Sequence, residues 1–195
     1  MLTIAEAAAR LGPNFENIAA DGAAALGETG LAPGAKVLDV GTGAGNFAIF
    51  LAMRGFQVLT GEPETDETHY ARKDWAQNAS NVGVRERITF EPFDASRMPF
   101  ADASFDGVFF FGVLHHIDAA VRTAVFGEAL RVVRPGGAVT FFEPRRETLE
   151  RVWTHDPGHP LAALPADYAA GHAVRERRLQ GRMMDIYIFR HAPGA

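Results

Sequence analysis

From Lys36 onward, short apolar runs alternate with longer stretches in which apolar residues recur at helical spacing. Apolar runs of this length are typical of strands buried on both faces of a parallel sheet. The pattern predicts an α/β fold with a doubly wound, mostly parallel sheet and helices on both faces. The predicted strands are KVLDV (36–40), FQVLTG (56–61), RITFEPF (87–93), FDGVFFFGVL (105–114) and AVTFFE (138–143).

Three segments between these strands predict helices. NFAIFLAMRG (46–55) carries apolar residues on successive turns and ends at a glycine, which favours helix termination. PETDETHYARKDWAQNASNVG (63–83) has a proline and acidic residues at its start, where a helix favours them. AAVRTAVFGEALRVV (119–133) follows Asp118, a predicted N-cap, and ends before Pro135.

The two ends of the chain predict further elements. Residues 1–35 carry apolar positions at helical spacing and predict one or two short helices. MMDIYIFRH (183–191) alternates as a strand does, with HAVRERRL (172–179) as its antiparallel partner. We therefore expect an antiparallel edge strand at the C-terminal side of the sheet, and a helix with loops over 144–168.

Composition limits the classes of protein. A chain of 195 residues with 47% hydrophobic residues can close one sizeable core, so we expect a single domain over 1–195. No apolar run reaches the length of about 20 residues that crosses a bilayer, and Glu6 and Arg10 interrupt the start of the chain. We expect no membrane partner and a cytoplasmic location. The absence of cysteine excludes disulfides and thiolate chemistry, and the net charge of −5 disfavours nucleic acid as a partner.

Candidate chemistry begins in the glycine-rich run that follows the first predicted strand. Gly41, Gly43 and Gly45 allow positive φ and close approach of a ligand, and the next helix offers unpaired N–H groups. The spacing is G-x-G-x-G, whereas the dinucleotide fingerprint is G-x-G-x-x-G and would need a glycine at Asn46. Glu62 follows the second strand, where a carboxylate can bind a ribose diol. Dinucleotide enzymes and other adenosine binders both fit these residues.

Four motifs in order resemble the class I S-adenosylmethionine-dependent methyltransferases of the small-molecule type. They are VLDVGTGAG, VLTGEP, PFDASRMPFADASFD and FGVLHHI…ALRVVRPGGAVTFFEP, and together they cover most of residues 35–144. The resemblance implies a Rossmann-like seven-stranded sheet. Within a single domain it implies a helical N-terminal segment over 1–35, a cofactor-binding core over 36–144, and a substrate-side and sheet-completing segment over 145–195.

The resemblance also implies S-adenosylmethionine as cofactor, S-adenosylhomocysteine as product, and a set of cofactor-binding residues. The glycines would lie under the methionine part, with Asp39 ordering their loop. Glu62 would hold the ribose hydroxyls, although the proline that follows it is less usual in the family. Asp94 and the Ala95 backbone would meet adenine. The full set is Asp39, Gly41, Thr42, Gly43, Gly45, Glu62, Asp94, Ala95, Phe111 and Gly112.

Histidines supply the candidates for acceptor chemistry. His115 and His116 follow the fourth strand at the carboxyl edge of the sheet, where open α/β folds bind ligands, and either could act as a base or contact the substrate. A loop hydrogen bond is the structural alternative for both. Four further residues could line a substrate pocket or close the end of the sheet: Trp153, His155, His159 and Tyr168. His155, Asp156 and His159 have irregular spacing, so we predict no metal site.

We therefore expect methyl transfer from S-adenosylmethionine to a small-molecule acceptor. The run after the fourth strand is FGVLHH, without the Asn/Asp-Pro-Pro-aromatic run that the base-amine methyltransferases share, which also disfavours nucleic acid. Two alternatives remain at this stage: a non-catalytic S-adenosylmethionine-binding module and an NAD-dependent oxidoreductase. The chain is expected to be a monomer or a homodimer.

Overall fold

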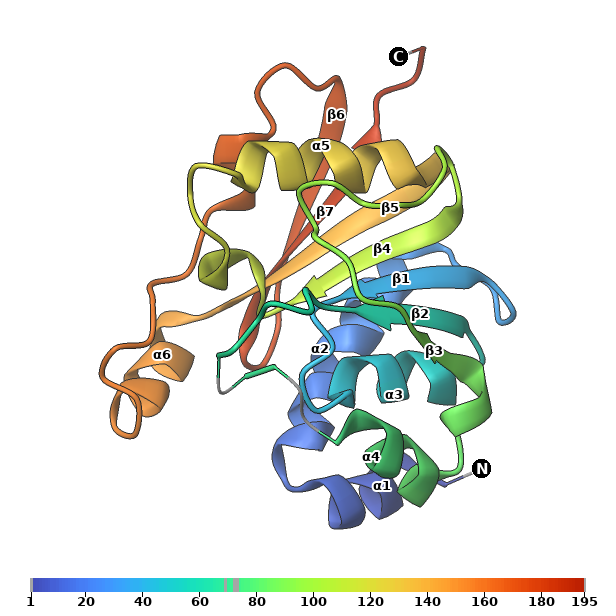
Figure 1. The fold of residues 1–195 in the computed structure, drawn as a ribbon, viewed down its shortest axis with the longest axis vertical. Coiled ribbons are helices and arrows are strands. Elements are labelled where there is room, and N and C mark those ends of the chain that lie inside the picture. Colours follow the sequence, from blue (N-terminus) through green and yellow to red (C-terminus); the bar gives the residue numbers. More distant parts are fainter. Residues whose placement is uncertain (1, 69, 72–73, 195) are drawn as a thin grey trace.

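The computed structural model describes residues 2–68, 70–71 and 74–194. A seven-stranded sheet crosses the molecule in the order β3-β2-β1-β4-β5-β7-β6 (Figure 1). Its strands are β1 (Lys36–Val40), β2 (Gln57–Gly61), β3 (Ile88–Phe90), β4 (Phe105–Phe111), β5 (Val133–Pro144), β6 (Val174–Gln180) and β7 (Met184–His191). The α-helices are α1 (Ile4–Leu11), α2 (Asn14–Thr29), α3 (Asn46–Met53), α4 (Trp75–Val82), α5 (Arg122–Val132) and α6 (Arg146–Trp153).

The strand pairing confirms the predicted fold class. The first five strands along the chain run parallel, and β7 pairs antiparallel with both β5 and β6. The predicted antiparallel C-terminal pair is therefore present, with β6 at the edge. The prediction of one domain over 1–195 stays a prediction.

Two hydrophobic cores cover the two faces of the sheet. One packs α1 to α4 against the sheet and contains Phe47 and Phe142; the other lies under α5 and contains Phe110, Phe126 and Phe141. Figure 1 shows α5 on one side of the sheet and α1 to α4 on the other. Because both faces are covered, the central strands are apolar nearly throughout, as the sequence pattern required.

Two helix predictions were wrong at their starts. The helix expected over 63–83 begins only at Trp75, because Asp74 supplies the N-cap by accepting a hydrogen bond from the Gln77 backbone N–H. The residues described between 63 and 74 form turns and loop, and residues 69, 72 and 73 lie outside the described set. Asp118 does not cap α5 either: it accepts a hydrogen bond from the Ala120 N–H within a turn, and α5 starts at Arg122.

The C-terminal hairpin is tied to the N-terminal helices by one buried carboxylate. Asp21 on α2 accepts hydrogen bonds from the backbone N–H groups of Arg182 and Met183, in the turn between β6 and β7, and of Met184, the first residue of β7. Three donors on one acidic side chain make strong, charge-assisted contacts. No helix among the described residues is long and apolar enough to cross a membrane.

Candidate functional site

The turn between β1 and α3, residues 41–45, is called here the glycine turn. Its three glycines have φ of +86°, +48° and +79° in chain order. A Cβ on Gly41 would lie 2.5 Å from a methyl group of Val113, and a Cβ on Gly45 would lie 2.8 Å from Cβ of Trp75. Among the described residues, the nearest atom to a Cβ on Gly43 would be the Tyr70 carbonyl oxygen at 3.4 Å. Gly41 and Gly45 are therefore required by packing, whereas Gly43 keeps space open.

Three buried polar side chains form a hydrogen-bonded series behind the glycine turn. The Thr60 hydroxyl donates to Asp39 Oδ2 at 2.9 Å, and the Thr42 hydroxyl lies 3.0 Å from that of Thr60. Asp39 Oδ1 has no hydrogen-bond partner among the described residues. Burial raises the pKa of Asp39 to about 7; the Thr60 hydrogen bond opposes the rise, and the charge of Glu62 adds to it. This arrangement supports the expected role of Asp39 in ordering the turn.

Glu62 connects the second strand to the glycine turn. It follows β2 directly, and its Oε2 accepts a hydrogen bond of 2.9 Å from the Gly43 backbone N–H. Its carboxyl group also lines the cavity described below. The side chain is thus fixed beside the turn, in the position where a ribose diol binds in doubly wound folds.

The loop after β3 forms a third wall. Asp94 Oδ1 accepts hydrogen bonds of 2.7 Å from both the backbone N–H and the hydroxyl of Ser96, which closes a tight turn. Further along, Glu128 accepts from the Met98 N–H, and Arg131 donates to the Met98 carbonyl. These contacts with α5 hold the loop against the body of the protein.

A cavity of about 650 Å³ lies between these elements, within the size range of small-molecule and cofactor sites. Most of the predicted cofactor-binding residues line it: Gly41, Thr42, Gly43, Glu62, Asp94, Ala95, Phe111 and Gly112. Asp39 and Gly45 lie behind that lining. Tyr70 and Val113 also line the cavity, although no motif pointed to them. Ile18 of α2 also lines the cavity, which agrees with a helical N-terminal segment that covers the site.

The two candidate histidines are placed differently. His116 lines the cavity, whereas His115 is 4% exposed and its Nδ1 lies 2.9 Å from Glu143 Oε2. The Ala163 N–H also donates to Glu143 Oε2, at 2.8 Å. Partial burial lowers the pKa of His116 to about 4, and the neighbouring His115 and His159 lower it further than Asp156 and Asp66 raise it. His116 is therefore a neutral imidazole at physiological pH.

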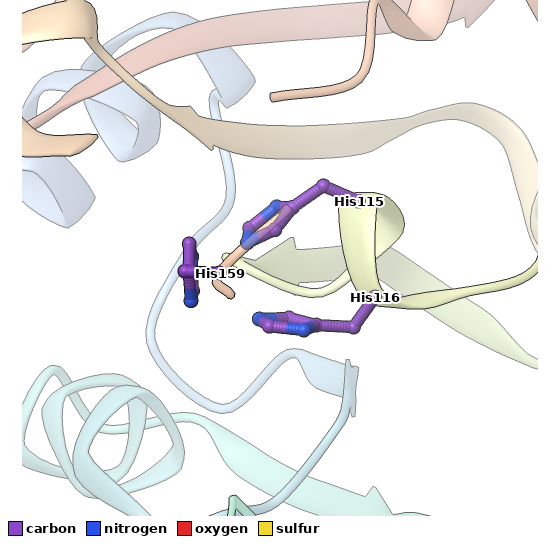
Figure 2. A group of neighbouring side chains, drawn as sticks. All are labelled: His115, His116 and His159. Carbon is purple, nitrogen blue, oxygen red and sulfur yellow. The ribbon is translucent and has the colours of Figure 1, made fainter. Parts of the chain in front are cut away.

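His159 joins this pair from a distant part of the chain. Figure 2 shows the rings of His115, His116 and His159 around a common space, and we call this group the histidine cluster. The His159 ring centroid lies 5.2 Å from that of His115 and 4.8 Å from that of His116. His155, which the sequence had grouped with His159, is exposed and lies outside the cluster.

Two aromatic residues of the C-terminal segment support the walls. The Trp153 indole N–H donates to the His159 carbonyl at 2.9 Å and holds the loop that carries the third histidine. The Tyr168 hydroxyl accepts a hydrogen bond of 3.0 Å from Arg122, which also donates to the carbonyl groups of His115 and Ile117. Trp153 and Tyr168 were expected either to line a substrate pocket or to close the end of the sheet. The structure favours the second role, since neither residue is among those that line the cavity.

The mostly parallel sheet, the glycine turn and the acid after β2 are the arrangement of doubly wound α/β folds, which bind ligands at the carboxyl ends of their strands. A family model described as a methyltransferase domain matches residues 37–137. The chain belongs to this methyltransferase domain family, and the resemblance to class I S-adenosylmethionine-dependent methyltransferases is confirmed.

Individual relatives agree with this assignment. The 27-O-demethylrifamycin SV methyltransferase of Amycolatopsis mediterranei is 37% identical over 107 residues, which is 55% of this chain and 38% of that protein. Demethylmenaquinone methyltransferase of Beutenbergia cavernae is 35% identical over 122 residues, 62% of this chain and 45% of that protein. The chain thus spans less than half the length of these two relatives.

A solved structure extends the similarity of fold. A proposed S-adenosyl-L-methionine-dependent methyltransferase from Methanococcus maripaludis superposes with a TM-score of 0.68 at 15% identity. The superposition covers 93% of this chain and 88% of that one, so the shared fold includes elements outside residues 37–137.

Proposed function

We propose that the chain transfers a methyl group from S-adenosylmethionine to a small-molecule acceptor. The observation that carries the proposal is the cavity of about 650 Å³, in which the glycine turn, Glu62 and the Asp94 loop face one space. The relatives named above act on small molecules, as their names state. A small-molecule acceptor, a cytoplasmic location and a monomer or homodimer stay predictions.

The residues present fit this cofactor. Space beside Gly43 admits a ligand against the backbone, because the described atom nearest to a Cβ there would be 3.4 Å away. Glu62 offers a carboxyl group for the two ribose hydroxyls, and Asp94 with the Ala95 backbone offers polar groups for an adenine. The backbone at Phe111 and Gly112 faces the same cavity, where the methionyl end would lie.

Positioning is the main task left to the protein. When bound, S-adenosylmethionine supplies a methyl group already activated by its sulfonium. The chain has to hold the acceptor atom in line with that methyl group, and such positioning can lower a barrier by roughly 7–11 kcal/mol. His116 lines the cavity as a neutral imidazole and can accept a proton from a hydroxyl acceptor. His115, buried behind it, would act by orienting its neighbour.

Calorimetric titration with S-adenosylmethionine, S-adenosylhomocysteine and NAD tests the proposal. We expect the two sulfur compounds to bind and NAD not to bind. Glu62→Ala should weaken their binding by about 1.5–3 kcal/mol, because hydrogen bonds between a charged group and the ribose are lost. The change also removes the acceptor of the Gly43 N–H, so a loss of order in the turn adds to the effect.

Glu91→Ala is the matched control, because Glu91 is an exposed acid that follows β3 as Glu62 follows β2 but does not line the cavity. It should leave binding unchanged. NAD binding without binding of either sulfur compound would contradict the proposal and favour the oxidoreductase alternative. Binding of S-adenosylmethionine with no turnover on any acceptor would favour the non-catalytic module.

A further inference from the structure

The histidine cluster has the composition and spacing of a metal centre. One ring nitrogen from each of His115, His116 and His159 lies within 4.8 Å of the others. Ligand nitrogens about 2.0 Å from a tetrahedral Zn²⁺ are roughly 3.3 Å apart, so shifts of about 1 Å would bring the rings onto one ion. His116 is exposed and lines the cavity, so its ring can be reached from there.

Carboxyl groups stand behind two of the three rings. His115 Nδ1 is bonded to Glu143 at 2.9 Å, which leaves Nε2 as the nitrogen that can face an ion. His159 Nδ1 lies 3.5 Å from Asp156 Oδ2 and 2.9 Å from the Tyr70 hydroxyl. Histidines that bind zinc usually have a carboxylate, a carbonyl or water on the second nitrogen, where it fixes the tautomer and the ring orientation.

The surroundings also favour a cation. Glu143 is 1% exposed, and its Oε1 has no hydrogen-bond partner among the described residues. A buried carboxyl group with one unpartnered oxygen is costly unless positive charge lies nearby. A divalent ion on Nε2 of His115 would supply that charge, because the Nδ1 atom of the same ring lies against the Glu143 carboxyl group.

We propose that His115, His116 and His159 bind one divalent transition-metal ion of the Zn²⁺ type at the edge of the cavity. Three protein ligands leave a fourth position for water or for an oxygen donor, as in catalytic zinc sites. Because His116 lines the cavity, that position is accessible from it. If the proposed methyl transfer holds, and this step rests on it, the ion would select acceptors that carry a hydroxyl or carboxylate oxygen. The ion would then acidify a bound hydroxyl in place of His116, which serves as a ligand and not as a base when the metal is present.

Titration of the untagged chain with Zn²⁺ alone tests the site, and Co²⁺ absorption reports the coordination geometry. We expect one ion per chain and the visible absorption of four-coordinate Co²⁺. His116→Ala or His159→Ala should weaken Zn²⁺ binding by at least about 100-fold, and Glu143→Gln, which retains a hydrogen-bond acceptor, by about 10- to 100-fold.

His155→Ala is the matched control, because it removes an exposed histidine from the same loop without changing the cluster. Thermal unfolding of each variant without metal checks that the protein is folded. Because His116 is exposed, His116→Ala is the variant expected to disturb the fold least. Equal Zn²⁺ affinity of wild type, His116→Ala and His159→Ala, or no saturable Zn²⁺ binding, would overturn the site. Neither result depends on S-adenosylmethionine, so failure here is separate from failure of the proposed methyl transfer.

Discussion

The glycine turn and the histidine cluster both reach one cavity, the cluster through His116, but they are assembled in different ways. The glycine turn comes from one continuous motif, and its partners Thr60 and Glu62 belong to the neighbouring strand β2 or follow it directly. The histidine cluster joins the end of β4 to His159, which lies beyond α6 in the chain. A sequence motif can specify the glycine turn through local geometry. The histidine cluster, in contrast, exists only after the C-terminal segment has folded onto the sheet.

Each region also contains a buried carboxyl group with one oxygen lacking a hydrogen-bond partner among the residues described: Asp39 and Glu143. Asp39 accepts a hydrogen bond from the Thr60 hydroxyl and lies near the charge of Glu62. All three residues belong to the first two sequence motifs, VLDVGTGAG and VLTGEP. Glu143 accepts from a backbone N–H and lies beside an imidazole, both from other segments. Glu143 therefore holds segments together, whereas Asp39 supports one turn.

The largest effect is expected for Glu143→Ala. It leaves the Ala163 N–H and His115 Nδ1 buried without their partner. We expect the free energy of unfolding to fall by roughly 2–6 kcal/mol, about 1–3 kcal/mol for each of the two groups. Urea denaturation measures the change.

Glu147→Ala is the control, because Glu147 is an exposed acid whose side chain is 67% accessible and pairs with Arg145 at 3.5 Å. Exposed pairs contribute about 0–1 kcal/mol, so this variant should resemble wild type. Equal stabilities of the two variants would show that Glu143 does not hold the two segments together.

The next largest effect separates two glycines of the same turn. Gly41→Ala should lower the free energy of unfolding by about 2–4 kcal/mol, through the positive φ and the overlap with Val113. Gly43→Ala should cost about 1–2 kcal/mol from φ alone, because its surroundings leave room.

Ligand binding should reverse that order among folded molecules. The methyl group of Gly43→Ala projects into the space assigned to the cofactor, so S-adenosylhomocysteine affinity should fall more for Gly43→Ala than for Gly41→Ala. Calorimetry at a temperature where both variants are folded measures this. Loss of stability without loss of affinity at Gly43 would show that this space is not used by the ligand.

These contrasts explain which parts could be predicted from the sequence. The parallel strands, the C-terminal hairpin and the part of the cavity lining that comes from the glycine turn, Glu62 and the Asp94 loop followed from apolar runs and from the motifs. The helix starts at Trp75 and Arg122 could not be predicted, because Asp74 and not the earlier proline and acids supplied the cap, and Asp118 was used in a turn. His159 was grouped with its sequence neighbour His155, since spacing carries no information on the fold of the segment after α6.

The smallest of the three effects is a pH dependence at Asp39. Its pKa is raised from 3.8 to about 7 in the folded chain, mainly by burial, so the folded state holds a proton that the unfolded state releases. Stability contributed by this group is therefore present at low pH and is lost as pH rises through about 7. Between about pH 5.5 and about pH 8 the loss should be roughly 2 kcal/mol, at 1.36 kcal/mol per pKa unit.

Asp39→Asn isolates this contribution, because the amide retains the acceptor for the Thr60 hydroxyl and cannot ionise. The difference in free energy of unfolding between wild type and Asp39→Asn should change by roughly 2 kcal/mol over the same pH range, while the histidines titrate alike in both. Urea denaturation of the ligand-free chain at each pH gives the two curves. Parallel curves would mean that Asp39 ionises in the folded protein as it does in the unfolded one. The hydrogen-bonded side chains of Asp39, Thr60 and Thr42 would then have to be open to water.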